Sequence, residues 1–483
     1  MSKQLAVVGV GSNINPLVNL RKALSSLKKI QNCKVLNVAK IYESDALLPE
    51  GLSSLEITKW NKKYLNSAIL VEVESFNPEA FLCVLKDIEK KIGRSESARW
   101  APRLIDLDLL WVSDYEHMSH NLTIPHKELL NRPFALLPLL DLISEERVFN
   151  ISVAKAKSLK KPFWMSLDVK PFQTHVSQKF AWPLMVGILN VTTDSFSDGG
   201  KFLHQSESED VDLNALEKQL DHYMEQGLDV LDIGAESTRP NALFVSPATE
   251  IARLQKTLSF VEKYKQTQNI QFEVSVDTRK PEVLREIIHK FDINYINDVE
   301  GFRSVEMRSL AADSSAKIVC MHSFSVPPRK DETLPGDIDI FEYLNKWWQQ
   351  KLEMFGKINI SKERLIFDVG IGFGKTPEQC FHLLGHLHKL SQIHEDIYIG
   401  HSRKSFLSHV TDKPFEERDL ETAFVSQNLN QAYVQQLRVH NIKLNKDFLN
   451  ADQKQIDSLL KLENQNLETF HKIKNLMGSK YES

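Results

Sequence analysis

Two carboxylates and two arginines lie close together in residues 99–108, which read Arg-Trp-Ala-Pro-Arg-Leu-Ile-Asp-Leu-Asp. Asp106 and Asp108 alternate with apolar residues, and residues two apart on a β-strand point to the same face. Neighbouring carboxylates repel each other unless a cation lies between them, and Mg²⁺ is usually held by carboxylates together with substrate phosphates. Arg99 and Arg103 carry guanidinium groups that match phosphate oxygens. The stretch therefore predicts a magnesium and phosphate site, and an edge strand with a solvated polar face is the alternative.

The composition is typical of a globular protein with more than one domain. The chain has 483 residues, of which 42% are hydrophobic and 26% charged. A net charge of −4 gives no footprint for nucleic acid, so any phosphate binding is expected to be local. The apolar runs are shorter than the ~18 residues of a membrane span, and the N-terminus resembles a strand rather than a signal peptide. We therefore expect a cytoplasmic protein with no membrane partner.

The cysteine pattern favours the same compartment. Cys33, Cys83, Cys320 and Cys380 are far apart and form no Cys-x-x-Cys pair. This spacing predicts free thiols in a reducing environment, with neither a disulfide framework nor a zinc site.

The first part of the chain alternates strand and helix patterns in the order β-α-β-β-α-β. The expected strands cover residues 5–10, 35–42, 64–73 and 104–112, and the expected helices cover 17–30 and 78–92. This order predicts a ferredoxin-like α+β sandwich. Residues 43–63 form a long polar connection, and connections of this length often act as functional lids.

From residue 183 onward, short apolar segments alternate with longer helical patterns. The eight segments cover residues 184–191, 230–233, 272–276, 293–296, 317–321, 365–369, 397–399 and 435–439. Eight strand–helix repeats predict a (β/α)₈ barrel, whose active site lies at the C-terminal ends of the strands. Polar residues stand at or just after each expected strand end, namely Asn190, Asp232, Asp277, Asn297, Asp298, His322, Asp368, Ser402, Lys404, Arg438 and His440. We expect these side chains to converge on one rim.

These patterns predict a first domain at 1–160, a linker at 161–179 and a second domain at 180–483. A small hairpin that opens the second domain is one interpretation of the linker. The tail after residue 441 has an apolar stripe at helical spacing. It is expected to supply the last barrel helix and an extension, or alternatively a helix that binds a partner.

Several motifs of the first domain resemble 6-hydroxymethyl-7,8-dihydropterin pyrophosphokinase over about residues 3–150. They are Gly11-Ser12-Asn13, Tyr64-Leu65-Asn66, residues 99–108, Pro125-His126 and residues 131–134. The resemblance implies that Asp106 and Asp108 hold two Mg²⁺ ions that bridge the phosphates of ATP. It implies a part in catalysis for Arg94, Arg99 and Arg103, and nucleotide binding by the same arginines together with His126 and Arg132.

The resemblance also places the pterin between the rings of Tyr64 and Phe134, with Asn66 contacting its edge. Core packing is the alternative for each ring. One departure concerns Ser95-Glu96-Ser97, where the family commonly has a further arginine. Since Glu96 would repel phosphate, we expect either that the work of this arginine is shared differently or that turnover is lower.

Motifs of the second domain resemble dihydropteroate synthase, in the family's order, from about residue 180 to 440. They are residues 190–200, 236–240, 275–278, 297–298, 368–375, 402–405 and 438–440. The resemblance implies that para-aminobenzoate displaces pyrophosphate from the exocyclic methylene of the pterin. Binding of the leaving pyrophosphate would then supply most of the catalysis. The departures Thr193, Asn241 and Val369 remove no functional group.

The same resemblance assigns the residues of the second site. A carboxylate can accept the adjacent donors of the pterin's amino-pyrimidine edge, and the implied pterin residues are Asp277, Asn297, Asp368 and Lys404, with Lys404 also catalytic. The implied pyrophosphate residues are Asn190, Thr238, Arg239, Arg438 and His440, with Asn190 also ligating one Mg²⁺. Phe373 and Ser402 match positions near the aminobenzoate.

Together the two resemblances predict a bifunctional folate-biosynthesis enzyme whose first product is its second substrate. Its expected partners are small molecules, and the barrel is expected to form a homodimer. A pterin-binding methyltransferase on a related barrel is an alternative. Ser402-Arg403-Lys404 argues against it, because a methyl donor has no pyrophosphate to hold. A further alternative makes one domain a scaffold without activity.

Overall fold

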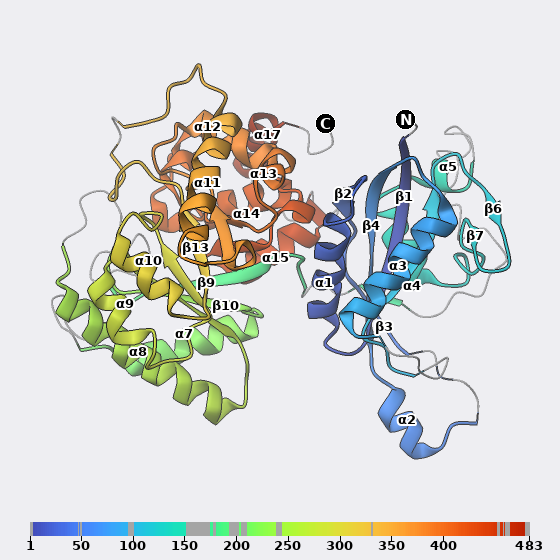
Figure 1. The fold of residues 1–483 in the computed structure, drawn as a ribbon, viewed down its shortest axis with the longest axis horizontal. Coiled ribbons are helices and arrows are strands. Elements are labelled where there is room, and N and C mark those ends of the chain that lie inside the picture. The colour runs from blue at the N-terminus through green and yellow to red at the C-terminus, as the bar shows by residue number, and fades with distance from the viewer. Residues whose placement is uncertain are drawn as a thin grey trace. The chain divides into compact units, whose positions relative to one another are not determined.

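The computed structural model describes residues 3–46, 48, 51–94, 101–150, 174–176, 180–192, 202–203, 210–237, 244–329, 332–451, 455–456, 458 and 464–478. The chain divides into two units, Met1–Trp182 and Pro183–Ser483 (Figure 1). None of the described helices is both long and apolar enough to cross a membrane. All four cysteines are free.

An antiparallel sheet forms the centre of the first unit. Its strands are β1 (Lys3–Ser12), β2 (Cys33–Val38), β3 (Tyr42–Ser44), β4 (Tyr64–Glu74), β5 (Asp106–Val112) and β8 (Thr174–Val176). They follow the order β5-β1-β4-β3-β8, and β2 also pairs with β4. The smaller elements of the unit are α2 (Ser54–Trp60), β6 (His117–Met118), β7 (Thr123–Ile124) and α5 (Glu145–Val148). The expected α+β sandwich is confirmed, and the long polar connection contains β3 and α2.

Helices cover both faces of this sheet. Figure 1 shows α1 (Pro16–Lys28) and α3 (Pro78–Ile92) on one face and α4 (Pro133–Leu140) on the other. Helix α3 begins where the Asn77 side chain accepts the Ala80 N–H, and it ends at Gly93, whose φ of 108° suits a left-handed cap. The core under α4 is apolar and includes Val7, Ala68, Leu110, Leu136 and Leu139. These contacts leave one end of the α4 face open.

Strand β8 lies in the segment that the sequence assigns to the linker. Its backbone pairs antiparallel with β3, with Ser44 opposite Thr174. The described part of this segment therefore extends the first sheet, rather than forming a hairpin that opens the second domain. An edge strand such as β3 presents unpaired N–H and C=O groups, and these groups accept an added strand.

The second unit is a closed barrel of eight parallel strands. They are β9 (Leu184–Asn190), β10 (Val230–Gly234), β11 (Glu273–Asp277), β12 (Tyr295–Asp298), β13 (Lys317–Met321), β14 (Leu365–Asp368), β15 (Ile397–Ile399) and β16 (Gln436–Val439). Each matches a segment that the sequence predicts. Val186, Val230, Tyr295, Val319, Ile366 and Tyr398 fill one layer of the interior. The predicted (β/α)₈ barrel is therefore confirmed.

Helices surround the barrel. They are α7 (Leu213–Glu225), α8 (Pro247–Gln268), α9 (Pro281–Ile287), α10 (Val305–Ala312), α11 (Ile340–Gly356), α12 (Pro377–Gly385), α13 (Leu387–Ile393), α14 (Asp419–Asn428) and α15 (Ile442–Asn450). A final helix, α17 (Asn464–Met477), packs against α12 and α14. Its buried side chains include Phe470, whose ring lies 5.3 Å from that of Phe424. Of the tail's apolar stripe, Ile456 and Phe470 are therefore buried, whereas Leu467 is exposed.

Phe470→Ala tests the attachment of α17. Phe470 is buried, so truncation leaves a cavity and is expected to lower the free energy of unfolding of the barrel unit by about 3 kcal/mol or more. Leu467→Ala on the same helix is the control, because Leu467 is 41% exposed and should cost less than about 1 kcal/mol. Equilibrium urea unfolding measures both values. Equal losses would show that the helix is not packed as described.

Candidate functional site

Two glycines make room for a pocket on the α4 face of the first sheet. Gly11 pairs with Asp106 on one side and Asn66 on the other, and Gly9 pairs with Asp108. Residues directly opposite one another on paired strands point to the same face. Because glycine has no side chain, the space between Asp106 and Asn66 stays open. A Cβ atom on Gly11 would lie 3.0 Å from the Asn66 Oδ1 atom.

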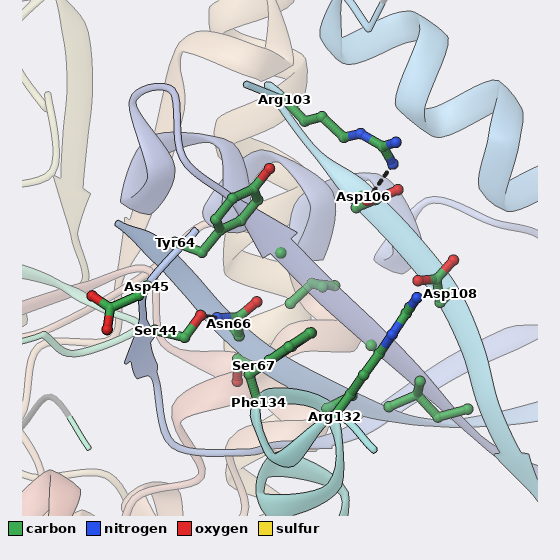
Figure 2. A pocket seen from close by; sticks show the side chains of 15 residues that line it. Ser44, Asp45, Tyr64, Asn66, Ser67, Arg103, Asp106, Asp108, Arg132 and Phe134 are labelled. Atoms are coloured by element: carbon green, nitrogen blue, oxygen red, sulfur yellow. Dashed lines mark hydrogen bonds and ion pairs between the residues drawn. The ribbon is translucent and has the colours of Figure 1, made fainter. Parts of the chain in front are cut away.

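The resulting pocket has a volume of about 180 Å³ and collects residues that the sequence singles out. Figure 2 shows the two carboxylates of β5 on one side and the side chains of β4 on the other. The lining includes seven of the predicted site residues, namely Tyr64, Asn66, Arg103, Asp106, Asp108, Arg132 and Phe134. Arg99 and residues 95–97 lie outside the described residues. Ser44 and Asp45 also line the pocket and were not predicted.

Asp106 is the electrostatic centre of this pocket. Its Oδ1 atom lies 2.7 Å from Nη1 of Arg94, and its Oδ2 atom lies 2.6 Å from Nη1 of Arg103. The Asp106 side chain is 28% exposed, so an incoming ligand has access to it. Guanidinium groups placed in this way can exchange a carboxylate partner for a phosphate, which has the same fork of oxygens.

Glu89 supports this arrangement and was missed by the sequence analysis. It is buried on α3, where its carboxylate accepts the Leu107 N–H at 2.6 Å and pairs with Lys86 at 2.8 Å and with Arg94. A signal for it exists, because Glu89 follows Leu85 by one helical turn and therefore shares the buried face of the helix. It ties the start of β5 to the arginine that contacts Asp106.

Asp108 has a different environment from Asp106. Its Oδ1 atom lies 3.7 Å from Nζ of Lys86, and the side chain of Arg132 approaches it in Figure 2. Burial lowers the pKa of His126, while the charge of Asp108 opposes this shift. His126 therefore lies within electrostatic reach of Asp108 and is held mainly neutral.

The described residues fit a metal ion whose coordination is completed by substrate and water. Among them, no group of three or more His, Cys, Asp or Glu side chains is arranged to hold a metal ion. Asp106 and Asp108 share a face and contribute two carboxylates. The remaining oxygens must come from substrate and water, as is usual for Mg²⁺ bound to nucleotide phosphates.

The second pocket has a volume of about 900 Å³ and opens at the C-terminal ends of the barrel strands. Its lining brings together nine of the predicted residues, namely Asn190, Asp277, Asn297, Asp368, Phe373, Ser402, Lys404, Arg438 and His440. Thr238 and Arg239 lie outside the described residues. Of the eleven strand-end residues, eight therefore converge on this pocket, whereas Asp232, Asp298 and His322 are not among its lining residues.

Arg438 lies between two carboxylates inside the barrel. Its Nε atom is 2.6 Å from Oδ2 of Asp232, and its Nη2 atom is 3.1 Å from Oδ2 of Asp277. Asn297 also donates to Asp232, at 3.3 Å. The guanidinium thus contacts the carboxylate assigned to the pterin, in addition to any contact it makes with pyrophosphate. The sequence analysis places Asp232 on the rim but gives it no part in the site.

The pKa of Asp277 departs from its usual range because a single cation, Arg438, contacts both Asp277 and Asp232. Burial, followed by the negative charge of Asp232, raises the pKa of Asp277 to about 8, although Arg438 opposes the shift. An ion pair with arginine alone would lower this pKa. The shorter contact of Arg438 goes to Asp232, so Asp277 receives less of the stabilisation that the cation gives to a carboxylate. Burial and the neighbouring Asp232 therefore favour the protonated form of Asp277 through its raised pKa.

Lys404 and Asp368 are a second pair of opposite charges, at the ends of the neighbouring strands β15 and β14. Lys404 donates to the Ile371 carbonyl at 2.8 Å, and its Nζ atom lies 4.9 Å from the centre of the Phe373 ring. Burial lowers the pKa of Lys404 to about 8, while Asp368 opposes the shift. Burial raises the pKa of Asp368, which accepts the Gly370 N–H at 2.8 Å.

Lys375 holds the loop that carries Phe373, and the sequence analysis missed it. Its ammonium group donates to the carbonyls of Gly370 and Phe373, both at 3.1 Å, and to Nδ1 of His322 at 2.9 Å. The apolar ring of Phe373 is thereby fixed at the pocket wall. At the other side of the pocket, Ser402 Oγ and His440 Nδ1 are hydrogen bonded at 2.9 Å. Burial holds the pKa of His440 well below its usual value.

Two buried polar atoms at this end of the barrel have no hydrogen-bond partner among the described residues. They are Oδ1 of Asn297, which lines the pocket, and Oδ1 of Asp232, which does not. A buried unpaired polar atom costs about 1–3 kcal/mol, so its presence points to a ligand or an ordered water. The carbonyl of Asn297 is thus available to a donor from a bound molecule.

Two family models match the chain. The family described as "Pterin binding enzyme" matches residues 186–440, which is more than half of the chain. The family described as "7,8-dihydro-6-hydroxymethylpterin-pyrophosphokinase" matches residues 7–144. Each match coincides with one of the two pockets.

Curated relatives contain both parts in one chain. The folate synthesis bifunctional protein of Chlamydia muridarum is 34% identical over 453 residues, which cover 92% of this chain and 96% of the relative. That of Arabidopsis thaliana is 30% identical over 487 residues, 91% of this chain and 94% of the relative. Among solved structures, dihydropteroate synthase from Yersinia pestis in complex with a sulfonamide drug gives a TM-score of 0.49 at 30% identity, covering 55% of this chain and 92% of that chain.

Asp277→Asn tests the raised pKa. In the unfolded chain this carboxyl ionises near pH 3.8, but in the folded chain it stays protonated up to about pH 8. Its contribution to stability is therefore full below the unfolded pKa and is lost as the pH rises through about 8. Relative to the variant, the free energy of unfolding of the wild type should fall between about pH 5 and about pH 8 by more than about 1.4 kcal/mol. Urea unfolding at several pH values measures this difference, and a flat or rising difference would contradict the assignment.

Proposed function

The chain belongs to the family of bifunctional folate synthesis proteins, and from this premise we propose which residues perform each of its two reactions. In the first reaction, ATP pyrophosphorylates 6-hydroxymethyl-7,8-dihydropterin and AMP is released. In the second, para-aminobenzoate displaces the pyrophosphate to give 7,8-dihydropteroate. One observation carries the assignment of residues: in each unit, most of the described residues that the resemblance selects from distant parts of the sequence gather in one pocket.

In the first pocket, we assign the phosphate end to Asp106 and Asp108 with the surrounding arginines. The two carboxylates would hold two Mg²⁺ ions with ATP, and these ions would supply neutralisation of phosphate charge. Arg94, Arg99 and Arg103 stabilise the transferred group, and His126 and Arg132 bind the nucleotide. Because AMP leaves, the pterin hydroxyl oxygen bonds to the β-phosphorus while the bond from that phosphorus to the bridging α–β oxygen breaks. Such a transfer depends on alignment and charge rather than on a covalent enzyme intermediate.

The pterin end of the first pocket is assigned to β4 and α4. Tyr64 and Asn66 lie two apart on β4 and therefore share the pocket face, while Phe134 approaches from α4. A flat bicyclic ring fits between two aromatic side chains. Asn66 already hydrogen bonds to Ser44 Oγ at 2.8 Å, and this bond fixes the amide for recognition of the pterin edge.

In the second pocket, we assign the pterin to Asp277, Asn297, Asp368 and Lys404. The carboxylate of Asp368 lies within electrostatic reach of Lys404 and accepts the Gly370 N–H. Since a carboxylate has two acceptor oxygens, it can also accept a pair of donors from the amino-pyrimidine edge of the pterin. Asn297 offers an unpartnered carbonyl oxygen. Phe373 and Ser402 are assigned to the aminobenzoate. The cation of Lys404 lies beside Phe373, at the proposed boundary between the two substrates.

The leaving pyrophosphate is assigned to the opposite side of the same pocket. The residues are Asn190, Thr238, Arg239, Arg438 and His440, with Asn190 also serving one Mg²⁺, which would supply further charge neutralisation. Breaking the bond to pyrophosphate leaves a cation-like methylene carbon, so donors that bind the departing oxygens lower the barrier. Since Arg438 contacts Asp277, we propose that it couples the pterin end to the pyrophosphate end.

Three further assignments rest on the sequence and the family resemblance. We propose domains at 1–160 and 180–483 with a linker at 161–179, a homodimer formed through the barrel, and a cytoplasmic location. The substrates are small molecules, and no nucleic acid is involved.

Separate assays of the two half-reactions test which pocket performs which reaction. Asp106→Asn is expected to lower AMP release at least about 100-fold, because an amide cannot replace a metal-binding carboxylate, while condensation of supplied pterin pyrophosphate with para-aminobenzoate stays within about twofold of wild type. Asp368→Asn is expected to do the reverse. Asp87→Asn is the matched control, since Asp87 is an exposed residue of α3. Enzymatic assays of AMP and of dihydropteroate give both rates.

Two results would contradict these assignments. One is loss of both reactions in a single variant that remains folded. The other is AMP release by the wild type without any dihydropteroate, even when the pyrophosphorylated pterin is supplied directly.

A further inference from the structure

The loop after β15 changes direction at Arg403. This residue has a φ of 59°, in the left-handed region that side chains other than glycine rarely occupy. Its neighbours Ser402 and Lys404 both line the second pocket, whereas Arg403 does not. The turn therefore places the side chains of Ser402 and Lys404 at the pocket and directs the side chain of Arg403 away from it. Something outside the loop must stabilise a conformation that costs energy by itself.

One face of α14 provides this support. Asp419, Thr422 and Ser426 are spaced by three and then four residues, so they share a face of the helix. Thr422 Oγ1 accepts the backbone N–H of Arg403 at 3.0 Å. The preceding His401 is buried, and its Nε2 atom lies 3.0 Å from Ser426 Oγ. The helix therefore holds the loop on both sides of Ser402.

Asp419 completes the support by binding the side chain of Arg403. Its two oxygens accept Nε–H and Nη2–H of Arg403 at 2.6 and 2.9 Å. This bidentate geometry is the strongest arrangement for an arginine and a carboxylate. The side chains are only 15% and 24% exposed, so the pair is better shielded from water than a surface ion pair. Asp419 is also the first residue of α14, where a negative charge suits the helix dipole.

The same carboxylate reaches a second loop of the pocket. Asn441 Nδ2 donates to Asp419 Oδ2 at 3.4 Å, and Asn441 directly follows His440. The side chain of Asn441 also caps α15 by accepting the Leu444 N–H. Asp419 thus connects the loops after β15 and β16, which meet in the hydrogen bond between Ser402 and His440.

We propose that Asp419 is a positioning residue for the pyrophosphate end of the second site. It touches no substrate and acts on His440 by two routes. Asn441 directly follows His440, and Arg403 directly follows Ser402, whose hydroxyl is hydrogen bonded to His440. It also neutralises Arg403, whose cation lies within electrostatic reach of His440. This inference rests on the proposed function, because it takes His440 as a contact of pyrophosphate.

Asp419→Asn in the full-length enzyme tests this proposal. The amide keeps the volume but loses the charged pair, so the KM for the pterin pyrophosphate and the inhibition constant of inorganic pyrophosphate should both rise about tenfold, which corresponds to about 1.4 kcal/mol. The inhibition constant of 6-hydroxymethylpterin, which lacks the pyrophosphate, should change less than about twofold. Asp419→Glu, which keeps the charge, should recover most of the loss.

Asp447→Asn is the matched control. Asp447 pairs with Lys443 on the exposed side of α15 at 2.6 Å, so this variant also loses an aspartate from an ion pair, but one outside the pocket lining. Its synthase constants should equal those of the wild type. AMP release by the first unit reports the amount of intact protein in each preparation.

The outcomes separate the inference from its premise. Unchanged constants in Asp419→Asn would overturn the proposal. Tighter pyrophosphate binding would also overturn it, since Asp419 would then compete with the anion for Arg403. An equal rise for the free pterin would overturn it too, because it would indicate a general structural effect. If pyrophosphate does not compete with pterin pyrophosphate in the wild type, the placement of pyrophosphate in the proposed function fails instead.

Discussion

The second active site depends on one partly buried cation, Arg438, placed between the side chains of two aspartates, the fully buried Asp232 and the partly buried Asp277. Asp232 is fully buried, and an unpaired charge at such a position would cost several kcal/mol. The guanidinium offsets this cost through contacts to Asp232 and Asp277. The three side chains come from β16, β10 and β11. Strands β10 and β11 are neighbours, and β16 comes close to them only because β9 pairs with both β16 and β10 and closes the barrel. The barrel is therefore needed to make the charge arrangement stable.

The first site also pairs a carboxylate with guanidinium groups, but there the carboxylate is more exposed to solvent. Asp106 is also held by two guanidinium contacts, but it is partly exposed. Exposed ion pairs contribute little to stability and exchange partners readily. The first site can therefore rearrange when a metal and a nucleotide enter, whereas the second site is organised before its substrate arrives. A preorganised polar site has less reorganisation to undergo during the reaction.

The sequence predicts the elements well because both kinds of sheet leave simple patterns. The barrel strands are short apolar runs that end in polar residues, and β5 alternates two acids with a buried core. Strand β8 is different, because its pairing with β3 is decided by an available sheet edge that no local pattern reveals. Glu89, Lys375 and Asp419 were missed for a related reason, because each contacts a residue that is distant in the sequence and is brought close by the fold. These partners are Leu107, His322 and Arg403.

The contrast in charge between the two sites agrees with the direction of the chemistry. The first site must bind phosphates and metal ions. It offers two accessible carboxylates, and its arginines can exchange a carboxylate partner for a phosphate. The second site must bind pyrophosphate and then release it. There the charge of Arg438 is shared with two acids, that of Arg403 is neutralised by Asp419, and burial keeps His440 neutral through its lowered pKa. A neutral imidazole and partly neutralised guanidinium groups still donate hydrogen bonds, but they attract the anion less strongly than free cations would. The site can therefore stabilise the leaving group as the bond breaks without retaining it as a product.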